Sequence, residues 1–212
     1  MTNVINVHIT TLFDTPPKAR LCAEDYIAAP QSVHKSDLIE GVFVMASPFS
    51  LVHLELQAFL LTTLRVFAGA YRLGEVLGGR VAYKLDDENV FQPDVSFIHQ
   101  DRLHLACEVY VDGPPDLAVE VISPSSRQYD LVEKRINYAR FGAREYWVID
   151  PIERSASVYE LVQGEWIPIR AEEGVLRSKV LDGFWLRLDW LFPTEGQDRP
   201  SELEIARQQG LI

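Results

Sequence analysis

One stretch, residues 114–151, limits what this chain can fold into. It reads PPDLAVEVISPSSRQYDLVEKRINYARFGAREYWVIDP, which predicts a strand, a serine- and proline-rich turn, a helix over 129–141 and a second strand. Together these elements form one βαβ crossover. Such crossovers are right-handed in nearly all cases, so the helix must pack back over the sheet. The sequence therefore predicts an α/β domain that contains a parallel strand pair.

The first strand of this crossover carries a carboxylate in an otherwise apolar run. Period-two alternation puts Glu120 on one face with Ala118 and Ile122, and the opposite face holds Leu117, Val119 and Val121. A strand followed by a crossover helix is normally buried on both faces, where an ionised carboxylate needs a cation, a metal or hydrogen bonds. Glu120 therefore needs a partner.

The helix that follows offers a partner. At about 100° per residue, its apolar residues form a broad arc: Leu131, Val132, Ile136, Tyr138, Ala139 and Phe141. Lys134 and Arg135 lie inside that arc, whereas Glu133, Asn137 and Arg140 are expected to face water. The first turn of the helix, with Lys134, should lie near the carboxyl end of the strand that bears Glu120.

The preceding residues predict the rest of a core. A hairpin is expected over 36–47 with Glu40 beside its turn, then a long helix over about 49–68 that Ser47 and Pro48 begin. His53 lies on the inner stripe of this helix. The segment LGEVLGGR is interpreted as a turn, and strands follow over 80–85 and 90–99. The element order is therefore helix, strand, strand, strand, helix, strand.

A second carboxylate interrupts an apolar strand in this half of the chain. Asp94 follows Pro93 in the strand over 90–99 and shares a face with Ser96 and Ile98. Two acids on successive strands of one sheet can face the same cleft. Asp94 and Glu120 are therefore the leading candidates for a functional site.

The remaining residues predict an antiparallel extension and two polar ends. Strands are expected over 156–162, 166–170 and 180–192, and a short helix over 201–209. We expect a single domain over 1–212, with its core at about 36–151, a β-rich extension over 152–192 and a polar tail over 193–212. Residues 1–20 show no regular period and predict an arm or a frayed strand.

Charge and hydropathy exclude several classes of function. The 212 residues carry a formal net charge of −11, so the surface should repel phosphate backbones unless a local basic groove or metal ions reverse the sign. No apolar run approaches the roughly 18 residues of a membrane span, and the start lacks the pattern of a secretory signal. These features predict a cytoplasmic protein with no membrane partner.

The two acids and the lysine favour a metal-dependent phosphodiester hydrolase. Mg²⁺ takes oxygen ligands and commonly keeps several waters, so Asp94, Glu120 and a substrate phosphate oxygen would suffice to hold it, and the carbonyl of Val121 could add a further ligand. A bound metal lowers the pKa of a coordinated water, and an ammonium nearby can stabilise the charge that develops at phosphorus. Lys134 fits that role.

Two motifs in this chain resemble the PD-(D/E)XK nuclease superfamily, and within it the Uma-two family of restriction-endonuclease-like domains. They are QPDVSFI at 92–98 and the stretch at 116–151; weaker support comes from LIEGVFVMASP with His53, and from SKVLDGFWLRLDWLF. The resemblance covers roughly residues 20–192. It implies a restriction-endonuclease-like αβββαβ core with a mixed sheet, and an endonuclease that hydrolyses DNA with Mg²⁺, for which Mn²⁺ could substitute.

The resemblance also assigns the site residues. Asp94 becomes the motif aspartate and Glu120 the motif acid, both metal ligands. The motif lysine should stand at position 122, which is Ile122. In families of this superfamily the lysine can come from the neighbouring helix, which makes Lys134 a migrated catalytic lysine. His53, Glu40 and Arg135 are further candidates to line the site.

Other interpretations stay open at this point. Asp94, Glu120, Lys134 and Arg135 could form an ion-pair network that only fixes the fold. The protein could also be a catalytically silent, nuclease-like interaction module, as Ile122 and the acidic surface suggest. The serines of SPSSR could bind phosphate, but before a helix they predict first of all a capping turn. The aromatic residues Trp166, Trp185 and Trp190 could supply a homodimer interface.

Overall fold

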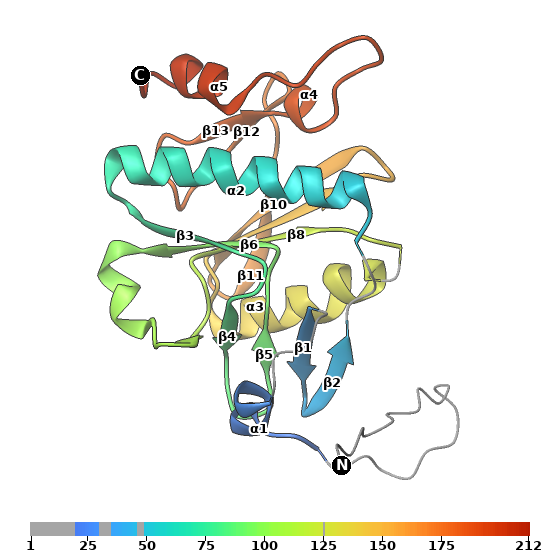
Figure 1. The fold of residues 1–212 in the computed structure, drawn as a ribbon, viewed down its shortest axis with the longest axis vertical. Coiled ribbons are helices and arrows are strands. Elements are labelled where there is room, and N and C mark those ends of the chain that lie inside the picture. Colours follow the sequence, from blue (N-terminus) through green and yellow to red (C-terminus); the bar gives the residue numbers. More distant parts are fainter. Residues whose placement is uncertain (1–19, 30–34, 46–48, 125) are drawn as a thin grey trace, which may run out of the picture.

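A computed structural model describes residues 20–29, 35–45, 49–124 and 126–212 (Figure 1). The predicted arm, apart from Arg20, and the predicted helix start at Ser47 and Pro48 lie outside these residues. Helices and mixed sheets confirm the α/β fold class. The long helix begins later than expected, because Ser50 caps it by accepting a hydrogen bond from the amide of His53.

A six-stranded sheet forms the centre of the molecule, in the order β11-β10-β9-β8-β6-β3. Its strands are β3 (Gly74–Gly78), β6 (Val95–His99), β8 (Leu117–Val121), β9 (Glu145–Asp150), β10 (Ser155–Val162) and β11 (Glu165–Ile169). β8 and β9 are parallel and every other neighbouring pair is antiparallel. The parallel pair is the predicted crossover, and the β10–β11 hairpin extends the sheet as expected.

Different layers cover the two faces of this sheet (Figure 1). On one face lies α2 (Leu51–Tyr71), whose buried stripe packs into the main core: Leu56, Phe59, Leu60, Leu64 and Phe67. On the other face lies the crossover helix, a π-helical segment η2 (Tyr129–Lys134) continued by α3 (Arg135–Phe141). β8 is buried on both faces, as the sequence predicts.

By length and hydropathy alone, α2 could also cross a membrane, although its sequence predicted no membrane span. In this fold 44% of its most apolar 18-residue window is buried. The inner stripe lies against β-strand residues such as Val95, Val119 and Trp147 in the same core. The buried stripe therefore belongs to the interior of the domain.

A second, five-stranded sheet lies beside the crossover helix, in the order β2-β1-β5-β4-β7 (Figure 1). Its strands are β1 (Ser36–Ile39), β2 (Val42–Met45), β4 (Ala82–Lys84), β5 (Val90–Phe91) and β7 (Tyr110–Asp112). The helix α1 (Ala23–Ala28) and the 3-10 helix η1 (Gln100–Leu105) complete this half. The polypeptide thus alternates between two sheets, which the sequence did not predict.

The first strand of the core lies where the sequence predicted a turn. The segment LGEVLGGR contains β3, and the strand expected over 80–85 belongs to the second sheet as β4. Gly74 has φ +150°, and a Cβ there would lie 2.0 Å from the carbonyl oxygen of Ile98. The glycine therefore allows a close approach between strands, which a glycine-rich sequence does not distinguish from a turn.

The strand expected over 90–99 is broken in two. β5 pairs within the second sheet and β6 within the main sheet, with Gln92, Pro93 and Asp94 between them. Pro93 has no amide hydrogen to donate to a ladder, which favours an interruption there. Asp94 consequently stands at the point where the chain passes from one sheet to the other.

The π-helical segment changes the face that the crossover helix buries. Val132 and Ile136, expected in the apolar arc, are 45% and 61% exposed, whereas Asn137, expected in water, is buried. A π-helical turn closes i→i+5 hydrogen bonds, so a wheel at 100° per residue assigns the wrong face. The predicted arc is therefore wrong at these three positions.

The C-terminal region differs from the strand predicted over 180–192. It contains β12 (Val175–Arg177), β13 (Trp185–Arg187), α4 (Leu188–Leu191) and α5 (Glu202–Gln208). The amides of Lys179 and Val180 donate to the buried carboxylate of Glu145, at 2.6 and 2.9 Å, instead of to a strand. The carboxylate thus holds this segment in an irregular conformation against the sheet.

Candidate active site

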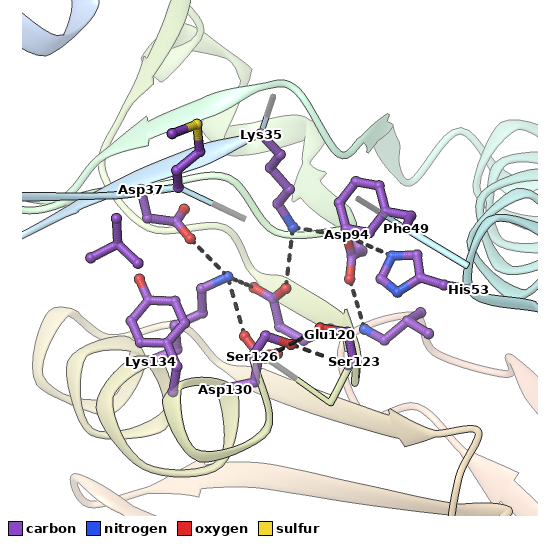
Figure 2. Close-up of a pocket in the computed structure, with 14 residues that line it drawn as sticks. Lys35, Asp37, Phe49, His53, Asp94, Glu120, Ser123, Ser126, Asp130 and Lys134 are labelled. Atoms are coloured by element: carbon purple, nitrogen blue, oxygen red, sulfur yellow. Dashed lines mark hydrogen bonds and ion pairs between the residues drawn. The ribbon is translucent and has the colours of Figure 1, made fainter. Parts of the chain in front are cut away.

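A pocket of about 520 Å³, counting its open mouth, lies where the two sheets meet the π-helical segment (Figure 2). β1 contributes Asp37, with Lys35 just before it, and α2 contributes His53. Asp94 lies before β6, and Glu120 is part of β8. The two acids that the sequence singled out therefore face the same pocket.

Asp94 is held on several sides. Its Oδ1 lies 2.8 Å from Lys35 Nζ and 3.3 Å from His53 Nε2, and its Oδ2 accepts a hydrogen bond from the Val121 amide at 2.8 Å. Gln57 Nε2 donates to the Asp94 main-chain carbonyl at 2.9 Å. These contacts fix one acid against the strand that carries the other.

Glu120 is 1% exposed and lies between two ammonium groups. Its Oε1 lies 2.9 Å from Lys134 Nζ and accepts from the Tyr138 hydroxyl at 3.3 Å. Its Oε2 lies 3.4 Å from Lys35 Nζ. Each carboxylate oxygen therefore has its own cation, and Lys35 connects Glu120 to Asp94 (Figure 2).

Lys134 is buried and pairs with two further acids besides Glu120. Its Nζ lies 3.1 Å from Asp37 Oδ2 and 3.4 Å from Asp130 Oδ1. Asp130 belongs to the same π-helical segment, which turns both side chains into the pocket. Lys134 therefore joins the second sheet, the central strand and the crossover helix in one ionic cluster.

The electrostatics of the cluster separate the two leading acids. Burial alone would raise the pKa of Asp94, but Lys35 and His53 outweigh that effect and hold it below its ordinary value. Burial raises the pKa of Glu120 to about 7, although Lys134 and Lys35 oppose the shift. Burial likewise raises the pKa of Asp130. Burial lowers the pKa of Lys35 and of Lys134, but the acids outweigh it and raise both above the ordinary value.

Sequence reasoning missed three members of this cluster: Lys35, Asp37 and Asp130. A signal existed for Asp130, because it precedes Lys134 by four residues and so lies on the same side of the helix. Lys35 and Asp37 are two residues apart, which places them on one side of the chain entering β1. Nothing local to that strand indicates that it meets Glu120.

The other predicted site residues are placed as follows. Val121 lines the pocket through the amide that donates to Asp94; a metal-binding role for its carbonyl oxygen stays a prediction. His53 lines the pocket with its ring stacked on Phe49, at 4.2 Å between centroids. Ser123 and Ser126 also line it and hydrogen-bond to each other in a turn before the π-helical segment, which itself has no side-chain cap.

Two predicted site residues lie elsewhere. Glu40 is exposed in the β1–β2 turn with φ 46°, and its amide donates to Asn89 Oδ1. Arg135 stacks over Tyr159, with 4.4 Å between the guanidinium carbon and the ring centroid, and lines a separate groove with Trp166. Neither lines the pocket, because the hairpin turn and the end of the π-helical segment direct both residues away from it.

The donor set fits a divalent cation. Four carboxylates face two ammonium groups, so the ionised cluster has two negative charges in excess. In the described part of the chain, His53 Nδ1 and Tyr129 Oη are buried in this region without a hydrogen-bond partner. Among those residues, no group of three or more His, Cys, Asp or Glu side chains is arranged to hold a metal ion. Mg²⁺ requires none, since one or two carboxylates and several waters can hold it.

Comparisons with known proteins bear on the fold and the family of this chain. A crystal structure described as a putative nuclease belonging to DUF820, from Anabaena variabilis, is similar to this chain with a TM-score of 0.68. The sequences are 17% identical, and the match covers 81% of this chain and 97% of the other, so the two share a fold. No protein with a curated description matches. The Uma2 family, described as "Putative restriction endonuclease", matches residues 23–189, and this chain belongs to that family.

Proposed function

We propose that the protein is a Mg²⁺-dependent endonuclease that hydrolyses DNA phosphodiester bonds, with Asp94 and Glu120 holding the metal. Family membership supports a nuclease. The observation that carries the metal assignment is that one oxygen of each acid lies within reach of a single cationic group, Lys35 Nζ, at 2.8 and 3.4 Å. Two carboxylates that share one ammonium can share one metal ion.

The chemistry divides between the metal and the side chains of this chain. A divalent ion held by Asp94 and Glu120 would lower the pKa of a bound water and neutralise charge on the phosphate. Lys134 holds Glu120 through Oε1, and its positive charge would stabilise the charge that develops on a phosphate bound at this site. The Val121 amide and His53 hold Asp94 in place.

Lys134 replaces the lysine that the superfamily motif puts at position 122. Ile122 is buried in an apolar cluster with Phe91, Tyr138 and Val148, so position 122 offers no amine to the pocket. Lys134, from the neighbouring helix, lies 2.9 Å from Glu120 instead. This supports the proposal that the catalytic lysine has migrated from the strand to the helix.

The substrate and the setting follow from the family and the composition. We propose DNA as the substrate, Mn²⁺ as a substitute metal and the cytoplasm as the location. With a net charge of −11, the protein needs metal ions at the site or a local basic groove to attract a phosphate backbone. A homodimer stays a prediction. Its expected aromatic residues are engaged within the chain, since Trp190 packs on Trp185 and the Trp166 indole donates to the Arg135 carbonyl.

Cleavage of supercoiled plasmid tests the proposal. The wild-type protein should nick or cut DNA with Mg²⁺ or Mn²⁺ and be inactive with a chelator. Asp94→Asn and Glu120→Gln should each lower the rate by roughly 10³-fold or more, a loss of about 4 kcal/mol of transition-state stabilisation. Glu75→Gln removes an exposed strand carboxylate and should cut normally. Cutting that persists in both site variants would reject the assignment.

A catalytically silent interaction module is the second candidate. The specific observation in its favour is that Lys35 and Lys134 between them pair with all four acids, so that the cluster also works as a structural ion-pair network. This candidate predicts no cleavage of DNA or RNA and no calorimetric binding of Mg²⁺ or Mn²⁺. Metal titration of the wild type therefore separates the two.

A further inference from the structure

Lys35 lies where both proposed metal ligands converge. It directly precedes β1, its side chain is 7% exposed, and its Nζ contacts Asp94 Oδ1 and Glu120 Oε2 (Figure 2). It belongs to neither motif by which the chain resembles nucleases. A buried ammonium that reaches two acids from a different sheet calls for an explanation.

The two lysines of the pocket have different partners. Lys134 pairs with Glu120 through Oε1 and with two acids outside the proposed metal site, Asp37 and Asp130. In the described part of the chain, the ion pairs of Lys35 are with Asp94 and Glu120, through the oxygens that Lys134 does not contact. Lys35 therefore occupies the position of a cation that both acids share.

We propose that Lys35 is a tethered counter-ion that holds Asp94 and Glu120 together in the metal-free protein and is displaced when a divalent ion binds. This inference rests on the metal-dependent function proposed above. A metal ion needs the same oxygens at about 2.0–2.1 Å that the ammonium contacts at 2.8 and 3.4 Å, so the two cations would be in close, poorly screened repulsion. Lys35 thereby sets the metal affinity of the site.

The charge of the pocket explains why such an exchange can be favourable. With Lys35 in place, four carboxylates face two ammonium groups, and the cluster carries two excess negative charges. Replacing the ammonium of Lys35 by a divalent ion reduces the excess to one. Without either cation, the buried Asp94 would have no ammonium partner and the buried Glu120 would keep only Lys134, which is costly. Lys35 stabilises the metal-free site. The free energy needed to displace it therefore opposes metal binding.

Calorimetric titration with Mn²⁺ at pH 8 tests the inference on the full chain. Lys35→Met removes the charge and keeps most of the side-chain volume, so it should bind Mn²⁺ roughly tenfold more tightly than the wild type. Lys84→Met is the matched control, because Lys84 pairs with the exposed Asp87 at 3.2 Å, and it should bind as the wild type does. Without metal, Lys35→Met should melt at a lower temperature than the wild type. Mn²⁺ should raise the melting temperature of Lys35→Met by more than it raises that of the wild type.

The outcomes separate this inference from the proposed function. Unchanged or weaker Mn²⁺ binding by folded Lys35→Met, while the wild type binds and Glu120→Gln does not, would overturn the role of Lys35 and leave the metal site standing. Absence of Mn²⁺ binding in both the wild type and Lys35→Met would overturn the metal site as well. If Lys35→Met fails to fold, Lys35→Gln, which keeps a hydrogen-bond donor without the charge, gives the same comparison.

Discussion

The two faces of strand β8 are both buried, but only one of them carries a charged group, Glu120, beside the apolar Ala118. Leu117, Val119 and Val121 pack against α2 in an apolar core, whereas Glu120 on the other face lies in a cluster of buried ions. Neighbouring residues of one five-residue strand thus serve different purposes. The side chains of the apolar face can be replaced by other apolar side chains of similar total volume. The charged side chain Glu120 instead requires cationic partners at particular distances.

The largest expected change in stability comes from the ionic face. Lys134→Met leaves three buried carboxylates, those of Asp37, Glu120 and Asp130, without their shared ammonium. We expect the free energy of unfolding to fall by about 3–5 kcal/mol, measured by urea denaturation without metal. The adjacent Arg135→Met loses only a contact with Tyr159 and should cost about 1 kcal/mol or less. Equal effects in the two variants would contradict the assignment of the two side chains.

The apolar face should affect stability and leave the chemistry unchanged. Leu117→Ala creates a cavity in the core under α2, where Leu117 is fully buried, and should cost about 3 kcal/mol. The cleavage rate per folded molecule should stay within about twofold of the wild type. A loss of cleavage as large as that of Glu120→Gln would mean that the two faces of β8 are not separable.

Burial of Glu120 should make stability depend on pH. Because its pKa is raised to about 7 from 4.5, the folded protein keeps a proton that the unfolded chain has already lost in this window. The contribution of Glu120 to stability therefore falls as pH rises from about 4.5 to 7. In metal-free buffer, Glu120→Gln should gain about 2–3 kcal/mol relative to the wild type across that range. A difference in unfolding free energy that stays constant from pH 4 to 8 would contradict this prediction.

The smallest effect is expected on the outer side of the crossover helix. Ile136 is 61% exposed, so Ile136→Lys should change the free energy of unfolding by no more than about 0.5 kcal/mol. A regular helical wheel makes this residue part of the buried arc and predicts a loss of several times that size. Chemical denaturation distinguishes these two expectations. A large loss of unfolding free energy would mean that Ile136 is buried and would contradict its placement on the exposed side of the helix.

The sequence was sufficient to predict the crossover, both faces of β8 and the inner stripe of α2, because these depend on local periodicity. It also predicted the approach of Lys134 to Glu120, because crossover handedness limits where the helix can lie. It could not predict that Lys35 and Asp37 enter the pocket. Their place depends on how a second sheet packs against the first, and no pattern within β1 records that packing.

The boundaries of the core strands were also outside the reach of local patterns. Gly74 belongs to a strand because another backbone approaches it closely, and the segment after Arg177 is irregular because Glu145 binds its amides. Both causes are tertiary contacts. The π-helical segment is a similar case, since it leaves Val132 and Ile136 exposed and buries Asn137, against the arc that a regular helix predicts.

The most direct test of the account is a crystal structure of the protein with Mn²⁺, located by its anomalous scattering. We expect one ion bonded to an oxygen of Asp94 and an oxygen of Glu120, with Lys35 Nζ withdrawn from both carboxylates. This expectation would be contradicted by a crystal at saturating Mn²⁺ that shows no ion between these acids and Lys35 still bridging them.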